Sequence, residues 1–416
     1  MAMTRRDFLR HGAGAFTVGL AGPAVLADLA RAQGSGRRAL VVCFFAGGND
    51  ALSTLVPYTD PYYYSRRPSI AVAAGDALQV GSDSSGVSLG LHPGLPALRA
   101  IFNEGRLAIV QRTGYANSTR SHFLGTDVWG SANPASPQSH GWLGRYLDTL
   151  PQPVDPLAAW DAVREIPRAL TSDHVPVPAI PSASGYVFSA VNGGAEAARE
   201  RVFAERLASR DASDRPHLAF VNAGIDAAMN TLDKVALVAK YAPAAVYPST
   251  PTGTTLKTVA GALVKGVGTR VFWVQLGGFD THAAQAATYP RLMTEFNDAV
   301  VAFYADLRAQ GLWGDVLLMT FSEFGRRAYE NGSAGTDHGA AGLMFAAGGA
   351  VRGGLYGTAA SLNPAPDNPA LENSGGDVGY ETDFRSVYAR VIDHWLGGDS
   401  VSILQGDFRR PGLAFV

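Results

Sequence analysis

The run Ala39-Leu40-Val41-Val42-Cys43-Phe44-Phe45 leads directly into Ala46-Gly47-Gly48-Asn49-Asp50. Seven apolar residues that end at a glycine turn are typical of a strand buried on both faces. The glycines let the backbone approach a ligand, and Asp50 would project at the end of the strand. A carboxylate there can hold a metal ion, although an Asx turn that caps the next helix would need the same residues.

Further apolar runs of strand length alternate with helix-like segments. The other runs are Leu107–Gln111, Arg270–Leu276, Val316–Phe321 and Leu343–Ala347. The helical segments are Pro96–Asn103, Pro216–Tyr241, Thr255–Val267, Tyr289–Gln310 and Thr382–Leu396. This alternation predicts an α/β fold with a mostly parallel central sheet flanked by helices on both faces. In such a sheet, ligands bind beyond the carboxyl ends of the strands.

The amino terminus has the pattern of an export signal. Thr4-Arg5-Arg6-Asp7-Phe8-Leu9-Arg10 precedes a weakly apolar stretch, Gly12–Leu26, which is interrupted by glycine and proline. That stretch is too short for the roughly 20 apolar residues of a membrane-spanning helix. Ala30-Arg31-Ala32 offers small residues to a signal peptidase. We expect a twin-arginine signal peptide at residues 1–32, carriage by the twin-arginine translocase, and a periplasmic or extracellular protein without a stable membrane span.

Composition narrows the class of protein. The 34 Lys and Arg residues nearly balance the 36 Asp and Glu residues, and no basic patch suggests a nucleic-acid partner. Cys43 is the single cysteine, which excludes an intramolecular disulfide. We expect one α/β domain over residues 33–416, in which the helical and loop-rich stretch at about 151–251 forms an inserted cap or lid.

A polar cluster follows the second strand. Asn117-Ser118-Thr119-Arg120-Ser121-His122-Phe123 combines hydroxyl groups, a cation and an imidazole before a predicted helix. A serine at a helix start can act as a nucleophile, and Arg120 could bind an anionic substrate. Ser121 and Ser118 are both candidates for the nucleophile, and either could instead be only a helix cap.

Polar residues also follow the third and fourth strands. Asp280 and His282 are two positions apart, so in an extended chain they point to the same side, as two ligands of one ion would. Glu323 follows the fourth strand, and His338 lies in the next loop. Both could complete a set of oxygen and nitrogen ligands, and Arg326 is a candidate anion contact.

At these positions the chain resembles domain of unknown function 1501, a family of twin-arginine-exported bacterial proteins that is similar to a distant branch of the alkaline phosphatase and sulfatase superfamily. The resemblance covers nearly all of the chain after the signal. It is carried by Phe45–Asp50, Arg120–Phe123, Gly141–Arg145, Phe279–His282, Ser322–Arg326, Gly335–Gly339 and Thr382–Arg385.

The superfamily resemblance implies an alkaline phosphatase-like fold, one or two divalent ions between strand ends, and a hydroxyl or formylglycine nucleophile. Two departures leave open whether one ion or two is bound. The Asp-to-His spacing is two residues where the superfamily usually has four, and Phe324 stands where a metal-binding histidine usually follows the acid. No Cys-x-Pro-x-Arg sequence is present, so the resemblance does not extend to a cysteine-derived formylglycine.

The main hypothesis is an exported, metal-dependent hydrolase of a phosphate or sulfate ester, with zinc, manganese or calcium as the metal and a small anionic ester or glycan-type substrate. The expected roles are catalysis by Ser121, Arg120 and His122, metal binding by Asp50, Asp280, His282, Glu323 and His338, and substrate binding by Asn49, Arg326 and Asp337.

Two other classes of function remain open. A non-catalytic periplasmic binding or assembly protein could keep the fold without the metal. A metal-free serine hydrolase could use Ser121 with His122 or His338 and an acid, although the sequence has no Gly-x-Ser-x-Gly elbow.

Overall fold

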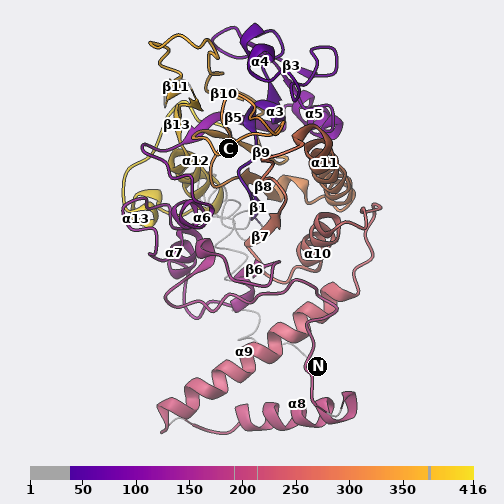
Figure 1. Ribbon diagram of the computed structural model, residues 1–416. Helices are drawn as coiled ribbons and strands as arrows, with labels where there is room; N and C mark the ends of the chain where they lie inside the picture. Colours follow the sequence, from indigo (N-terminus) through magenta and orange to yellow (C-terminus); the bar gives the residue numbers. More distant parts are fainter. Residues whose placement is uncertain (1–37, 192, 213, 373–375) are drawn as a thin grey trace, which may run out of the picture. The chain divides into compact units, whose positions relative to one another are not determined.

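An eight-stranded sheet is the centre of the computed structural model (Figure 1). Its strands lie in the order β10 (Gly354–Tyr356), β5 (Leu107–Gly114), β9 (Gly342–Ala347), β8 (Val316–Phe321), β1 (Ala39–Phe45), β7 (Val271–Leu276) and β6 (Ala159–Asp161), and β13 (Thr382–Asp383) pairs with β5. The strand predicted at residues 39–45 is therefore confirmed with its bounds, and it lies inside the sheet.

The structure describes residues 38–191, 193–212, 214–372 and 376–416. Residues 39–416 form one compact unit. The signal peptide predicted at residues 1–32 lies outside the described residues. Within the described ranges, no helix combines the length and the apolar character needed to cross a membrane.

Most pairs of neighbouring strands in the sheet are parallel, as predicted. β1 runs parallel to β7 and β8, and β6 runs parallel to β7. β9 is the exception, because it is antiparallel to both β5 and β8. The amino end of β9 therefore meets the carboxyl ends of β1, β5, β7 and β8 at one edge of the sheet.

Helices cover both faces of the sheet (Figure 1). Val41, Cys43 and Phe45 of β1 point to one side and join a core with α5 (Pro96–Asn103), α10 (Pro251–Lys265) and α11 (Gln285–Ala309). The alternate residues Leu40, Val42 and Phe44 point to the other side. That core includes α6 (His122–Ser131), α7 (Trp142–Asp148), α12 (Phe384–Val391), the π-helical turn η4 (Ile392–Leu396) and α13 (Ser400–Leu404). The α/β class with helices on both faces is confirmed.

Smaller elements surround the edge of the sheet where β1 ends. A three-stranded sheet has the order β2 (Leu55–Val56), β4 (Ser88–Leu91), β3 (Leu78–Ser82), and the helices α3 (Ala51–Thr54) and α4 (Pro61–Arg66) accompany it. A two-stranded sheet pairs β11 (Leu371–Glu372) with β12 (Asp377–Val378). The short 3-10 helix η3 (Trp313–Asp315) precedes β8.

The segment 151–251 is not wholly separate from the sheet, because it contains β6. It also contains η1 (Pro156–Ala158), η2 (Arg168–Leu170), α8 (Gly194–Ala208) and α9 (Pro216–Ala239). α8 packs on α9, and α9 contacts α10 and η1. Its role as a cap or lid remains a prediction.

Candidate metal centre

Close backbone contacts join the loops at the polar edge of the sheet. Gly47 has a φ of 124°, and a Cβ atom at this position would lie 2.4 Å from the backbone nitrogen of Asp280. A Cβ atom at Gly335 would lie 2.2 Å from the backbone carbon of His282. Both positions therefore require glycine, and their close packing brings the loops after β1 and β7 and the loop before β9 together.

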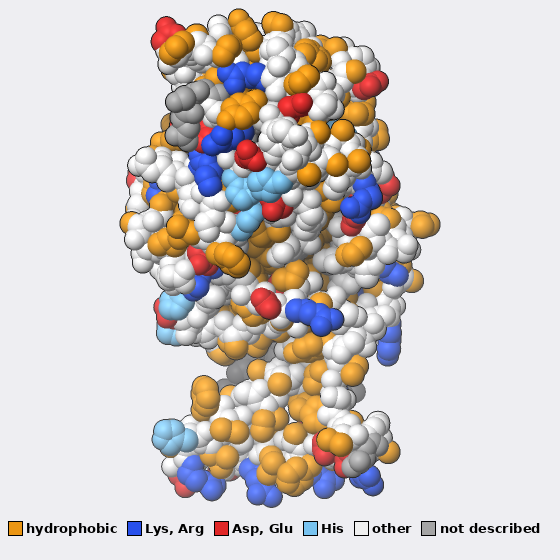
Figure 2. All heavy atoms as spheres, viewed as in Figure 1, with side chains coloured by type: hydrophobic (Ala, Val, Ile, Leu, Met, Phe, Trp, Pro, Cys, Tyr) orange, Lys and Arg blue, Asp and Glu red, His pale blue; other side chains and the backbone are white. Residues whose placement is uncertain are grey.

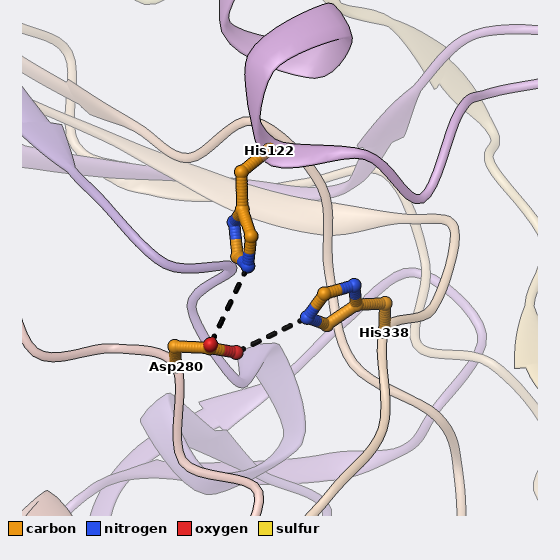
Figure 3. A group of neighbouring side chains, drawn as sticks. All are labelled: His122, Asp280 and His338. Atoms are coloured by element: carbon orange, nitrogen blue, oxygen red, sulfur yellow. Dashed lines mark hydrogen bonds and ion pairs between the residues drawn. The ribbon is translucent and has the colours of Figure 1, made fainter.

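Three histidines converge on Asp280. Its Oδ1 atom lies 3.1 Å from Nε2 of both His282 and His338, and its Oδ2 atom lies 3.5 Å from Nε2 of His122. Figure 3 shows the rings of His122 and His338 directed at the Asp280 carboxylate. One ligand atom from each of these three residues lies within 4.8 Å of the other two, as in a metal site. The Nε2 atoms of His282 and His338 are 2.9 Å apart.

The other ring nitrogen of each histidine, Nδ1, contacts an oxygen atom. These oxygens are Glu323 Oε1 at 2.7 Å from His122, the backbone oxygen of Arg120 at 2.8 Å from His338, and Asp337 Oδ1 at 3.2 Å from His282. Carbonyl and ionised carboxylate oxygens only accept hydrogen bonds, so each Nδ1 donates one. A ring that is protonated only on Nδ1 directs the lone pair of its Nε2 atom at Asp280. This is the arrangement found around histidines that bind metals.

The pKa values of the cluster fit this arrangement. Burial, the largest effect, lowers the pKa of His338 and favours its neutral form. Burial opposes ionisation of Asp280, but the hydrogen bond from Arg326, the contact with His338 and the charge of Arg326 outweigh it and lower the pKa of this carboxyl to about 2. The cluster thus combines an ionised carboxylate with a histidine, His338, whose neutral form is favoured.

Arg326 is a buried support for Asp280. Its Nη2 atom lies 2.7 Å from Asp280 Oδ1, and its side chain is fully buried. The guanidinium also donates hydrogen bonds to backbone oxygens of Gly47, Gly48, Phe279 and Thr336. These contacts join the loops around the site, and the role of Arg326 as a substrate contact remains a prediction.

Glu323 supports a ligand instead of facing Asp280. It is 2% exposed, and its Oε1 atom accepts hydrogen bonds from His122 and from the backbone nitrogen of Gly47. Its Oε2 atom accepts one from the hydroxyl of Ser322 at 3.0 Å. Glu323 therefore contacts His122 and the loop after β1 in this structure, and its role as a direct metal ligand remains a prediction.

Asp50 belongs to a separate buried ion pair. Arg67 donates to both of its oxygens, at 2.6 and 3.1 Å, and the two side chains are 1% and 0% exposed. Ser53 and Gln285 also donate to Oδ2, each at 2.6 Å. Asp50 caps α3 through the backbone nitrogen of Leu52, which is the helix-cap alternative considered from the sequence. Among the described residues, the side chain of Asp50 bonds to Leu52, Ser53, Arg67 and Gln285, so the structure does not bring Asp50 into the histidine cluster.

The two candidate nucleophiles lie on either side of Arg120. Ser121 is exposed and caps α6, with its Oγ atom 3.5 Å from the backbone nitrogen of Leu124. Ser118 accepts a hydrogen bond from Arg120 Nη1 at 2.8 Å. No contact tests either serine as a nucleophile, so both remain predictions.

The other predicted substrate contacts have partners inside the protein. Asn49 is 2% exposed and bonds to Thr54 and Tyr289. Asp337 is 45% exposed and bonds to His282 and Asn331. The structure therefore buries Asn49, whereas Asp337 stays open to solvent and orients a histidine.

Two features of the site escaped sequence reasoning. His122 was expected as a catalytic residue, but its Nε2 atom lies 3.5 Å from Asp280 and it forms a group with Asp280 and His338 that could hold a metal ion. Phe324 packs against the rings of His338 and His122, with ring centroids 4.5 and 5.0 Å away. Its place directly after Glu323 was visible in the sequence, but the sequence did not reveal that it supports these imidazoles.

The donor set fits a transition metal better than calcium. Three imidazole nitrogens and one carboxylate are ligands that zinc and manganese accept. Calcium instead prefers six to eight oxygen ligands. The residues whose ligand atoms lie together in the manner of a metal site are His122, Asp280 and His338. His282 lies beside them, with its Nε2 atom 2.9 Å from that of His338, and its role as a ligand remains a prediction.

Comparisons with known proteins place the chain in a family. No curated protein matches it. The lipoteichoic acid synthase LtaP from Listeria monocytogenes is a solved structure with some similarity: the identity is 11% and the TM-score is 0.30, over 77% of this chain and 68% of that one. The family model described as "Protein of unknown function (DUF1501)" matches residues 37–373. The chain therefore belongs to the DUF1501 family.

Proposed function

We propose that this protein is an exported metal-dependent hydrolase of a phosphate or sulfate ester, with one metal ion held by His122, Asp280, His282 and His338. The observation that carries the proposal is the convergence of three Nε2 atoms on one carboxylate while each Nδ1 is fixed by an oxygen. Lone pairs that face a carboxylate repel one another unless a cation lies between them or a ring is protonated. A divalent cation would satisfy all four groups together.

The exposure of the four groups favours a catalytic over a structural metal site. The side chains of Asp280, His282, His122 and His338 are 46%, 44%, 35% and 20% exposed. Structural zinc sites are closed, whereas catalytic sites keep a position open for water or substrate. A substrate could therefore reach this cluster from solvent.

A metal in such a site acts as a Lewis acid that offsets negative charge on an ester and favours ionisation of a nearby hydroxyl group. The contribution of the chain is to orient the ligands. Glu323, Asp337 and the backbone oxygen of Arg120 fix the three rings, and Phe324 packs against two of them. Ser121, next to His122 in sequence and exposed, is the proposed nucleophile, and water is the alternative.

The test is metal content and hydrolysis by the mature protein and three variants. His338→Gln and Asp280→Asn each remove a proposed ligand. His140→Gln is the matched control, because His140 pairs with an aspartate, Asp173, at 3.3 Å outside the cluster. Loss of contacts that only support metal ligands already costs about 10–100-fold in affinity, so the first two variants should lose at least that much while the control keeps wild-type affinity.

The results separate the three classes of function. Stoichiometric zinc or manganese, with chelator-sensitive cleavage of p-nitrophenyl phosphate or sulfate, would support the proposal. Bound metal without cleavage of any ester would favour the binding protein. Cleavage that survives chelation and is blocked by an active-serine reagent would favour the serine hydrolase. Absence of stoichiometric metal would remove the metallohydrolase.

Export by the twin-arginine pathway is part of the proposal and rests on the arginine pair. Replacing Arg5 and Arg6 together by lysine should leave the precursor in the cytoplasm. Fractionation that finds the same amount of protein in the periplasm would contradict this route.

A further inference from the structure

Two arginines share one buried carboxylate near the histidine cluster. Asp377 is 1% exposed, and its Oδ2 atom accepts a hydrogen bond from Arg120 Nη2. Its Oδ1 atom lies 3.7 Å from Arg327 Nε. One negative charge thus faces two guanidinium groups, and this group of three residues keeps a net positive charge.

Both arginines are tied to the histidine cluster through their backbones. The backbone oxygen of Arg120 receives the hydrogen bond from His338. The backbone nitrogen of Arg327 donates to the backbone oxygen of Asp337 at 3.0 Å. Figure 2 shows Lys or Arg side chains beside the histidines on the same face of the molecule. The positive charge therefore borders the proposed metal site.

The two side chains are held in place but stay accessible. Arg120 is 28% exposed, and its Nη1 atom is fixed by the backbone oxygen and hydroxyl of Ser118, at 2.6 and 2.8 Å. Arg327 is 37% exposed. Its guanidinium donates one hydrogen bond to a described residue, at 2.5 Å to the hydroxyl of Tyr329. Arg326, by contrast, is fully buried, and its N–H groups donate hydrogen bonds to other parts of the protein.

We propose that Arg120 and Arg327 form a clamp for a tetrahedral oxyanion, the phosphate or sulfate group of the substrate. Guanidinium groups present planar sets of N–H donors that match the oxygens of these anions. Asp377 positions both groups and offsets one of their two charges, while the exposed carboxylate of Asp337 also attracts Arg327. The inference rests on the proposed function for the identity of the substrate. It assigns recognition of the anionic group of the substrate to Arg327 in place of Arg326.

The test is calorimetric titration of inorganic phosphate and inorganic sulfate into the mature protein, with and without bound metal. Arg327→Gln removes one arm of the clamp, and Arg327→Lys keeps the charge without the planar donor set. Arg409→Gln is the control, because Arg409 is an exposed arginine that pairs with Asp407 at 2.6 Å. Circular dichroism would check that each variant folds.

Hydrogen bonds to charged groups are worth about 1.5–3 kcal/mol, so Arg327→Gln should weaken anion binding by about 10–100-fold. Arg327→Lys should fall between this variant and the wild type, and Arg409→Gln should bind like the wild type. Tighter binding of phosphate would identify a phosphate ester and tighter binding of sulfate a sulfate ester, and either result supports the clamp. Unchanged affinity in Arg327→Gln would overturn it.

Failure of the clamp and failure of the hydrolase give different results. If anions bind through Arg327 to metal-free protein but no metal-dependent cleavage occurs, the clamp stands and the hydrolase does not. If cleavage depends on metal while Arg327→Gln changes neither KM nor anion affinity, the hydrolase stands and the clamp is overturned.

Discussion

Asp50→Asn should destabilise the protein without reducing its metal affinity. The carboxylate lies in a fully buried pair with Arg67 and also receives hydrogen bonds from Ser53 and Gln285. Burial opposes ionisation of Asp50, but the charge and hydrogen bonds of Arg67 outweigh it and lower the pKa of the carboxyl. Removing the charge leaves the guanidinium buried without its counter-ion.

Breaking a buried ion pair from one side typically costs about 3–5 kcal/mol. For roughly 380 residues, at about 2.1 cal/mol/K per residue, the entropy of unfolding is about 0.8 kcal/mol/K. The loss therefore corresponds to a decrease in Tm of about 4–6 °C, if unfolding is two-state. Arg67→Met should cost a similar amount, because it leaves the carboxylate without its cation.

Thermal unfolding of the wild type and both variants, in chelator and in excess zinc, tests this reasoning. We expect the same decrease in Tm under both conditions and wild-type metal content. If Asp50→Asn loses its metal while its Tm in chelator equals that of the wild type, Asp50 is a metal ligand and its assignment to the structural pair is refuted.

Three further predictions follow from single residues. Burial lowers the pKa of His92 to about 4, so the unfolded chain binds a proton at this histidine before the folded protein does as the pH falls from 6.5 to 4. The free energy of unfolding should therefore decrease by up to about 3 kcal/mol over this range. In urea unfolding, the stability of His92→Gln should vary less with pH than that of the wild type. Gly47→Ala should lower the free energy of unfolding by about 1–3 kcal/mol and weaken metal binding. The reason is that Gly47 has a φ of 124° and the added methyl group would lie 2.4 Å from the backbone nitrogen of Asp280. Gly75→Ala, where the methyl meets nothing within 4 Å, is the control in the same denaturation assay. Ser121→Ala should abolish ester cleavage while the free energy of unfolding decreases by less than about 1 kcal/mol. If the variant turns over ester as fast as the wild type, water rather than Ser121 is the attacking group.

The central strands were predictable because burial on both faces leaves a strong signal. β1 and β8 have the predicted bounds, since each is an unbroken apolar run that ends where the chain leaves the sheet. The direction of β9 was not predictable. Its sequence is apolar throughout, as in a parallel strand, and only its pairing with β5 and β8 makes it antiparallel.

The contents of the site were predictable to a lesser degree. Sequence reasoning selected five metal ligands because they follow strands that end at one edge: Asp50, Asp280, His282, Glu323 and His338. It could not tell which side chains face Asp280, since Glu323 and His122 both offer suitable ligand atoms. The difference arises from orientation: Glu323 turns toward Gly47 and His122, and His122 turns its Nε2 atom toward Asp280.

The same argument explains the two adjacent arginines. Arg326 and Arg327 are identical in chemistry, and the sequence offers no reason to prefer one as an anion contact. The backbone of Arg326 forms an isolated antiparallel β-bridge with that of His338. Its side chain points into the loops, where its N–H groups donate hydrogen bonds to backbone oxygens. The backbone of Arg327 forms an isolated antiparallel β-bridge with that of Asp377, and the side chain of Arg327 reaches solvent. Adjacent residues of an extended segment point in opposite directions, so one arginine can build the site while the other faces what binds there.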